Sequence, residues 1–370
     1  MLPQPPIWLI LLAFICILGP LVFFHELGHY LVGRFFGIAA ETFSIGFGHE
    51  LVGWTDKRGT RWKIAWLPLG GYVKWVGDMT AASQPGDLEA IPEHLRSRAF
   101  QVRSVWQRFL VVLAGPAANF LLAVAIFTAI YSLISGPETT RIGRIETHSA
   151  AASSDLKKGD RILSVAGRQT PTFDDIRALV AARPNQMVLI RLERDGAIRQ
   201  VIVEIGSESV SDNTGKKVTI GLLGVSPAPI SIVRALPFAV EQTARVTEVM
   251  VKGAWTLVVG EGSRADIGGP VRIAQFAGQA ASLGAVPFLE LLALFSINLG
   301  FINLLPVPLL DGGHLFFYAV EAIRRRPLSA RALDWAFRGG LALILALVVF
   351  TTINDLGSVG LWDRLQRLIG

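Results

Sequence analysis

The feature that most constrains this chain is an uninterrupted apolar run near its start, which reaches from Ile7 to Phe24 and contains no charged side chain. A helix rises about 1.5 Å per residue, so this run is long enough for most of a bilayer crossing. A secretory signal peptide would begin with basic residues and end at a small-residue cleavage site. The chain instead begins MLPQPPIW, and no A-x-A site follows the run. We therefore expect a first membrane helix that is retained.

Three further apolar stretches follow later in the chain. Hydrophobic residues make up 51% of the sequence and charged residues only 17%, against about 25% charged residues in an ordinary soluble domain. This composition predicts a polytopic α-helical membrane protein with about four transmembrane helices in a lipid bilayer. The single cysteine, Cys16, excludes an internal disulfide. The other spans are expected at about Val105 to Ser135, between Glu290 and Asp311, and between Arg338 and Asp355.

The net charge of +6 indicates membrane orientation and no nucleic-acid partner, because the basic residues are dispersed and no recognition motif accompanies them. Basic side chains are frequent in the loop between the first two spans, from Arg34 to Arg108, whereas none precedes Ile7. That loop should be cytoplasmic. Alternating spans then place both termini and the long segment between the second and third spans outside, and the cluster Arg324 to Arg326 inside.

The external segment divides into two parts. From Thr140 to Ser226 the composition is that of a soluble domain, with short β-branched runs between Gly, Asp and Asn turn signals. A helix is expected over Phe173 to Ala182, with Thr172 as its N-cap. From Ile230 to Gly260 apolar residues recur at helical spacing among charged ones, which predicts an amphipathic helix on the membrane surface or against the spans. The expected strands are Arg141 to Ile145, Arg161 to Val165, Val188 to Glu193, Gln200 to Ile205 and Val218 to Leu222.

Directly after the first apolar run, His25, Glu26 and His29 form the pattern H-E-x-x-H. Positions i and i+4 lie on one face of a helix, so both imidazoles can bind one Zn²⁺ while Glu26 acts as a general base. The alternative is a set of solvated polar groups at a helix end. Placing several ionisable groups at the end of a span costs free energy that a functional role would offset, so the pattern favours a zinc site.

A catalytic zinc ion usually takes three protein ligands, so one more must come from elsewhere in the chain. Asp311 stands out because it directly follows the third span, which is parallel to the first in this topology and ends at a similar depth. Pro306 and Gly312 beside it would also suit a plain helix stop. The other candidates near a membrane boundary are His49, His94, Asp78 and His314.

Two motifs in this order, HELGH at His25 to His29 and NLLPVPLLDGG at Asn303 to Gly313, closely resemble the site-2 protease family of intramembrane zinc metalloproteases, specifically its bacterial RseP-like group. The resemblance runs through nearly the whole chain. It implies a zinc site of His25, His29 and Asp311, with Glu26 as the base, that cuts peptide bonds in or near transmembrane segments of single-span membrane proteins. Further matches are Phe43 to Gly48, Leu69 to Lys74, Gly115 to Phe120 and Ile267 to Pro270.

The same resemblance implies regulated intramembrane proteolysis in a bacterial inner membrane. Its substrates would be of the anti-sigma-factor type or signal-peptide remnants, and an upstream site-1-type protease would act before it. Residues Thr140 to Ser226 would form one inserted periplasmic PDZ-like α+β domain, whereas better-known enterobacterial members carry two in tandem. The expected organisation is an N-terminal membrane part (1–139), the PDZ-like domain (140–226), a periplasmic amphipathic region (227–284) and a C-terminal membrane part (285–370).

A substrate helix must unwind before attack, and an exposed strand edge could hold it extended. The segments Phe43 to Gly48 and Trp62 to Lys74 are rich in Gly, aromatic and β-branched residues and predict a membrane-associated β-hairpin, with an ordinary cytoplasmic loop as the alternative. Within the second segment, Gly70, Gly71 and Tyr72 are expected to handle substrate. Asn303 is a further candidate by resemblance, although capping or packing explains it equally well.

Two other functions compete with a protease. One is a noncatalytic membrane receptor or scaffold, in which the PDZ-like domain captures partner tails and the histidines are inert. The other is a transporter, because helices broken by Gly or Pro and charges within the membrane mark substrate pathways. Four spans without an internal repeat weaken the transporter hypothesis.

Overall fold

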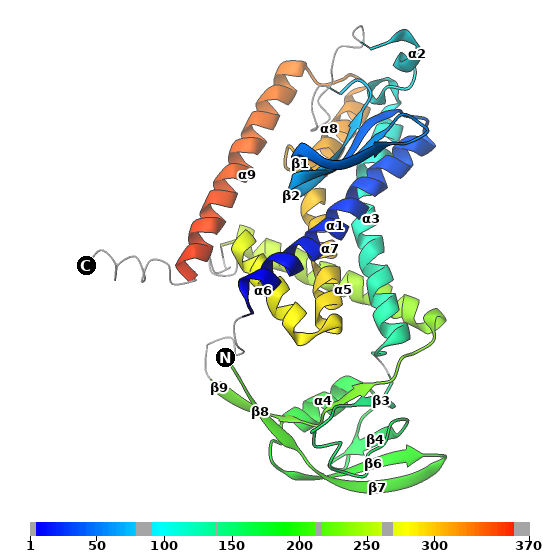
Figure 1. Ribbon diagram of the computed structural model, residues 1–370, viewed down its shortest axis with the longest axis vertical. Coiled ribbons are helices and arrows are strands. Elements are labelled where there is room, and N and C mark those ends of the chain that lie inside the picture. The colour runs from blue at the N-terminus through cyan, green and yellow to red at the C-terminus, as the bar shows by residue number, and fades with distance from the viewer. Residues whose placement is uncertain (1–4, 79–90, 138, 212–216, 261–268, 359–370) are drawn as a thin grey trace, which may run out of the picture. The chain divides into compact units, whose positions relative to one another are not determined.

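The computed structural model describes residues 5–78, 91–137, 139–211, 217–260 and 269–358 (Figure 1). The chain divides into two compact units, one built from Met1–Ala123 with Thr243–Gly370 and the other from Val124–Gln242. Part of the Ile267–Pro270 motif lies outside the described residues. Two helices, α3 (Val105–Leu133) and α5 (Ile232–Val258), each include residues of both units.

Within these described ranges, four helices are long and apolar enough to cross a membrane, as the sequence predicts. They are α1 (Ile7–Phe35), α3 (Val105–Leu133), α7 (Ala285–Leu304) and α9 (Ala330–Ser358). Helix α1 does not stop at the end of its apolar run. It continues through the H-E-x-x-H residues to Phe35, just before Gly37 at φ 77°.

The third span differs from its expected bounds of Glu290 and Asp311. Helix α7 begins at Ala285 and ends at Leu304, because Pro306 and Pro308 lack the N–H groups that would continue it. Asp311 therefore does not follow the span directly and does not stop a helix. It is the first residue of α8 (Asp311–Arg324), after six residues of irregular backbone.

The expected hairpin is present and longer than predicted, formed by β1 (Ala40–Thr55) and β2 (Arg61–Trp75). Both strands bend, so the first half of β1 lies between the two halves of β2: Phe43 pairs with both Trp62 and Val73. Glycines make the bends, with Gly46 at φ 88° and Gly70 at φ 112°, values that L side chains rarely adopt. The last part of β2 pairs with β1 and thereby forms one edge of this small sheet.

The hairpin packs against α1, α3 and α8 through a buried apolar cluster (Figure 1). Gly33 of α1 permits this packing, because a β carbon there would lie 2.1 Å from the Trp75 ring. The turn is fixed by Asp56, which accepts hydrogen bonds from Trp62 Nε1 (3.1 Å) and from the Tyr30 hydroxyl of α1 (3.2 Å). Although burial acts in the opposite direction, these and two backbone hydrogen bonds hold the pKa of Asp56 below its usual value.

Short elements complete the first unit. Helix α2 (Glu93–Arg96) and the 3₁₀ turn η2 (Phe100–Val102) precede α3. Helix α6 (Pro270–Leu283) packs on α1, where Gly278 leaves room for Ile10. Asp355 of α9 accepts hydrogen bonds from the backbone N–H groups of Gly269 and Arg272, both at 3.0 Å, and so satisfies free amides at the start of α6.

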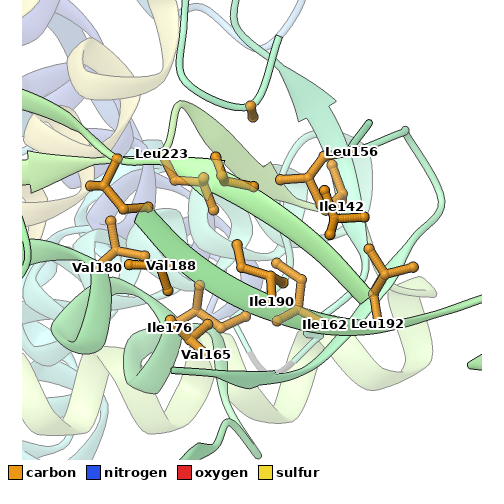
Figure 2. Close-up of a cluster of buried hydrophobic side chains, with 14 of the residues drawn as sticks. Ile142, Leu156, Ile162, Val165, Ile176, Val180, Val188, Ile190, Leu192 and Leu223 are labelled. Carbon is orange, nitrogen blue, oxygen red and sulfur yellow. The ribbon is translucent and has the colours of Figure 1, made fainter. Parts of the chain in front are cut away.

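The second unit contains antiparallel strands and one short helix around a single apolar core (Figure 2). Strand β6 (Met187–Arg194) alternates inward and outward, and buries Val188, Ile190 and Leu192. Helix α4 (Phe173–Ala181) begins at a capping box of Thr172 and Asp175, as predicted for its N-cap. Helix α5 (Ile232–Val258) follows the unit's last strand.

Strands β4 (Arg161–Val165), β6 and β7 (Ala197–Glu204) form a sheet in the order β5-β4-β6-β7, where β5 is Arg168–Gln169. Two strand pairs accompany it: β3 (Ile142–Ile145) with β10 (Val225–Pro227), and β8 (Gly206–Ser211) with β9 (Lys217–Leu222). The sequence predicts β3, β4, β6, β7 and β9, but not the three others.

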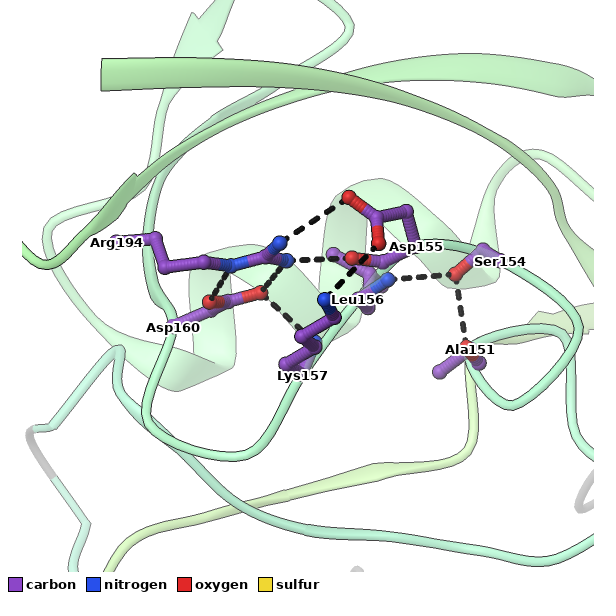
Figure 3. A network of polar contacts seen from close by, with 7 residues as sticks. All are labelled: Ala151, Ser154, Asp155, Leu156, Lys157, Asp160 and Arg194. Carbon is purple, nitrogen blue, oxygen red and sulfur yellow. Dashed lines mark hydrogen bonds and ion pairs between the residues drawn. The ribbon is translucent and has the colours of Figure 1, made fainter. Parts of the chain in front are cut away.

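One ion-pair network ties the second unit together (Figure 3). Arg194 of β6 donates from Nε to Asp160 Oδ1 at 2.7 Å and from Nη1 to Asp155 Oδ2 at 3.1 Å. The Asp160 side chain is 1% exposed. Its burial alone would raise the pKa of Asp160, but the hydrogen bonds and charge of Arg194 hold that pKa below its usual value.

Candidate active site

A cavity of about 400 Å³ lies in the first unit, between α1, β2, α3 and the α7–α8 connection. Its lining combines a few ionisable groups with apolar side chains. The lining includes the expected base, the ligand set implied by the family resemblance and the expected substrate-handling residues, which are His25, Glu26, His29, Gly70, Gly71, Tyr72, Asn303 and Asp311.

Three side chains converge in this cavity. The Nε2 atoms of His25 and His29 are 3.3 Å apart, and they lie 3.1 and 3.4 Å from Asp311 Oδ2. Asp311 Oδ2 is buried and makes no hydrogen bond of good geometry, despite these short distances. Three ligand atoms therefore point at one place, with spacings suited to a shared metal ion.

The continuous helix α1 places the two histidines on one face, one turn apart. The approach of Asp311 depends on the tight connection before α8. In that connection Leu309 adopts φ 84°, and a β carbon on Gly312 or Gly313 would lie 2.2 or 2.5 Å from a backbone oxygen. Only glycine fits at these two positions, so the turn returns directly into α8 and presents the carboxylate.

The four other candidates for a third ligand lie outside this group. Among the described residues, the metal-type group contains only His25, His29 and Asp311. His49 and His94 are exposed, on β1 and α2, and Asp78 is buried outside the cavity lining. His314 lines the same cavity one turn after Asp311, where it packs against Tyr318 and Phe337.

Helix α3 supplies contacts that the sequence alone does not reveal. His29 Nδ1 lies 2.8 Å from the Val111 carbonyl oxygen, and Asn119 Nδ2 lies 3.2 Å from His25 Nδ1. A β carbon on Gly115 would lie 2.2 Å from His29 Nε2. The sequence contains one indication of these contacts, the family match at Gly115–Phe120, but that match assigns no role to any single residue. The spacing of four residues between Val111, Gly115 and Asn119 puts all three on one face of α3.

The edge of β2 lies directly against α1. A β carbon on Gly71 would lie 2.6 Å from Val22 Cγ1 and 3.0 Å from Glu26 Cγ. Tyr72 stacks on Phe47, with ring centroids 5.8 Å apart. This strand edge therefore borders the same cavity as Glu26 and the three converging side chains.

Comparison with known proteins shows the family to which the chain belongs. The family described as Peptidase family M50 matches residues 13–347. The chain belongs to this family. A protein of Rhizobium meliloti is 45% identical over 362 residues, covering 93% of this chain and 95% of its own. One of Agrobacterium fabrum is 41% identical over 364 residues, covering 94% and 96%. Both are named a "putative zinc metalloprotease".

A third relative is named a metalloprotease. Metalloprotease MmpA of Caulobacter vibrioides is 36% identical over 379 residues, covering 94% of this chain and 95% of its own. Among solved structures, the PDZ domain of an SdrC-like protein from Listeria monocytogenes matches 24% of this chain and 85% of its own at 15% identity and a TM-score of 0.18. That TM-score is too low to carry an argument.

Membership in peptidase family M50, together with four membrane-type helices, makes this chain an intramembrane metalloprotease with zinc as its cofactor. The sequence prediction of the family, enzyme class and cofactor is thereby confirmed. A noncatalytic receptor and a transporter are not favoured.

Proposed function

We propose that His25, His29 and Asp311 hold the catalytic zinc, and that Glu26 is the general base in the hydrolysis of peptide bonds in or near transmembrane segments of single-span proteins. The observation that carries this proposal is the convergence of three ligand atoms within 3.1–3.4 Å of one another beside Glu26.

The donor set suits zinc in both type and spacing. Bonds of about 2.0–2.2 Å in a tetrahedron separate neighbouring ligand atoms by about 3.3–3.6 Å, close to the observed 3.1–3.4 Å. Two imidazoles and one carboxylate leave a fourth position for water or substrate, as catalytic zinc sites require. His29 also donates Nδ1–H to the Val111 carbonyl, which leaves the Nε2 lone pair for the metal.

The residues of the chain divide the chemistry between them. Zinc, when bound, supplies Lewis acidity that polarises the scissile carbonyl and acidifies water. Glu26 lies on the same helix one residue after His25 and lines the same cavity, where it accepts the proton of the attacking water and returns it to the leaving amine. The residue Glu26 as a whole is only 9% exposed, so bulk water does not compete freely for that proton.

We assign the edge of β2 to substrate binding. Among the described residues, the Gly71–Trp75 part of β2 pairs with a strand on one side only, and we assign its other side to an extended peptide. Gly71 allows this edge to touch α1 beside Glu26. Asn303 of α7 lines the same cavity, and we assign its amide to the substrate backbone.

We also propose which segments of the chain lie on each side of a bacterial inner membrane. The basic residues favour a cytoplasmic β1–β2 hairpin and a periplasmic segment between α3 and α7. In that segment, 140–226 would form a PDZ-like domain that meets the external part of a substrate, and 227–284 an amphipathic region. The membrane parts would be 1–139 and 285–370. An upstream site-1-type protease would trim substrates of the anti-sigma-factor type, whereas signal-peptide remnants would need no trimming.

The test is incubation of the purified full-length protein with a single-span candidate substrate, comparing wild type with Glu26→Gln. The amide cannot accept a proton but leaves the ligands in place, so the variant should retain zinc and lose cleavage. Cleavage by Glu26→Gln near the wild-type rate would remove the assigned base. Zinc retained by His25→Ala would instead remove the assigned metal site.

A further inference from the structure

The side chain of Asn119 is entirely buried on α3, where it contacts His25. Asn119 is 0% exposed, and its amide Nδ2 lies 3.2 Å from His25 Nδ1. Its Oδ1 has no hydrogen-bond partner. The backbone oxygen of the same residue accepts a hydrogen bond from Ser296 Oγ of α7 at 2.7 Å. The backbone of α3 is thus bonded to α7 at this residue, and the side-chain amide of Asn119 contacts His25 with its Nδ2 end.

The chemistry of His25 determines which end of the amide can serve the metal site. If Nε2 binds zinc, the neutral imidazole carries its proton on Nδ1 and must donate it. The amide NH₂ of Asn119 cannot accept that proton, whereas Oδ1 can. The two ends of an amide are nearly equal in size, and a 180° rotation exchanges them in place. That rotation also gives the orphaned, buried Oδ1 a donor.

We infer that Asn119 is a positioning residue for the zinc site: its Oδ1 accepts the Nδ1–H of His25 and so fixes the tautomer that presents Nε2 to the metal. This inference rests on the proposed ligand set. It gives His25 the same arrangement that His29 has with the Val111 carbonyl. One face of α3 then orients both histidines, with Gly115 between these two contacts leaving room for the His29 ring.

The test measures zinc affinity in the detergent-solubilised full-length protein by competition with a chromophoric chelator. Asn119→Ala should weaken zinc binding by about 10- to 100-fold, the usual cost of losing an outer-shell partner of a metal ligand. Asn119→Asp keeps an acceptor at the same place, so its zinc affinity should equal or exceed that of wild type. Ser296→Ala is the matched control, because it removes the other hydrogen bond of Asn119 without touching the amide, and should leave zinc affinity unchanged.

The outcomes separate this inference from the ligand assignment. Zinc affinity of Asn119→Ala at the wild-type level, with His25→Ala losing zinc, would overturn the positioning role alone. Weak binding by Asn119→Asp in a folded protein would overturn it too, because an acceptor would then not suffice. If Asn119→Ala fails to fold, Asn119→Leu takes its place, because it keeps the volume of the side chain and removes the acceptor, and it should weaken zinc binding to the same extent. If His25→Ala retains zinc, the ligand assignment fails first.

Discussion

Gly71 of β2 and Glu26 of α1 lie so close that no side chain fits between them: a β carbon on Gly71 would come within 3.0 Å of Glu26 Cγ and 2.7 Å of the Ser44 carbonyl oxygen. The strand edge proposed for substrate binding is therefore in direct contact with the proposed base. This contact fixes the distance between an extended peptide and the catalytic group, which makes a methyl group at position 71 a test of the edge-strand proposal.

Gly71→Ala should reduce cleavage strongly while leaving zinc bound. The added methyl group must push β2 away from α1, and a displacement of about 1 Å can cost about 100-fold in rate. None of the proposed ligands is touched. Cleavage and zinc content are measured on the same preparation. Gly253→Ala is the control, because Gly253 is an exposed residue of helix α5 where an added β carbon meets nothing within 4 Å. Full activity of Gly71→Ala would separate this edge from catalysis.

Asp311→Asn should weaken zinc binding and cleavage together, because a neutral amide is a poorer zinc ligand than a carboxylate. We expect zinc affinity to fall by more than the about 10- to 100-fold cost of losing an outer-shell partner. The chelator competition described above measures it. If zinc and activity both persisted, His314, which lines the same cavity, would become the better third ligand.

Site residues that are close together in the sequence could be predicted from it, whereas contacts between distant residues could not. His25, Glu26 and His29 follow from helical spacing alone, and Asp311 from a motif and an assumed pairing of spans. The contact between Asn119 and His25 joins residues 94 positions apart, and a packing contact of that kind has no local signature. The bent strands escaped prediction for a related reason: Gly46 and Gly70 permit a bend, but they do not specify that Phe43 pairs with both Trp62 and Val73.

The ion-pair network of the second unit predicts an acid-sensitive core. Asp160 has a pKa in the fold below its unfolded value of about 3.9. It therefore contributes stability that is fully present above about pH 4 and is lost as the pH falls through the lowered folded pKa. Hydrogen exchange of the peptide covering β6, corrected for intrinsic rates, should show protection that is constant from about pH 7 to 5 and declines below about pH 4.

At neutral pH, Asp160→Asn should reduce the same protection by about 100-fold. This corresponds to about 3 kcal/mol, the lower end of the cost of breaking a buried pair, because Asp155 still holds Arg194. Asp174→Asn is the matched control, since its pair with Arg177 is exposed and should contribute almost nothing. Equal protection in both variants would mean that Asp160 does not stabilise this sheet.

The proposed orientation is tested with introduced cysteines after replacement of Cys16. Lys57, Asp195 and Arg325 are all exposed turn or helix-end residues, so each tolerates the change and can be reached by a reagent. In intact cells whose outer membrane is permeabilised, an impermeant thiol reagent should label position 195 and spare 57 and 325. Labelling at 57 before lysis would invert the orientation.

The last prediction concerns the role of the second unit. None of the proposed zinc ligands, nor Glu26, lies in 140–226, and the backbone at its two ends is joined: the Gly136 N–H donates to the Ala228 carbonyl at 3.0 Å. A short linker between Thr139 and Pro227 should therefore replace the domain without disturbing zinc content. If the domain filters substrates by the size of their external part, the deletion variant should cleave single-span substrates with intact external domains as well as trimmed ones.

Wild type serves as the reference and should prefer the trimmed form, because a bulky external domain meets the filter before the span can reach the cavity. Zinc content and a size-exclusion profile establish that the deletion variant is folded before rates are compared. Loss of cleavage of the trimmed substrate in a folded, zinc-loaded deletion variant would show that the domain recruits substrates, as a groove that binds peptides by strand addition would. The two roles thus differ in the rate for the trimmed substrate, measured per bound zinc: deleting a filter leaves this rate unchanged and raises the rate for untrimmed substrates, whereas deleting a recruiting domain lowers it.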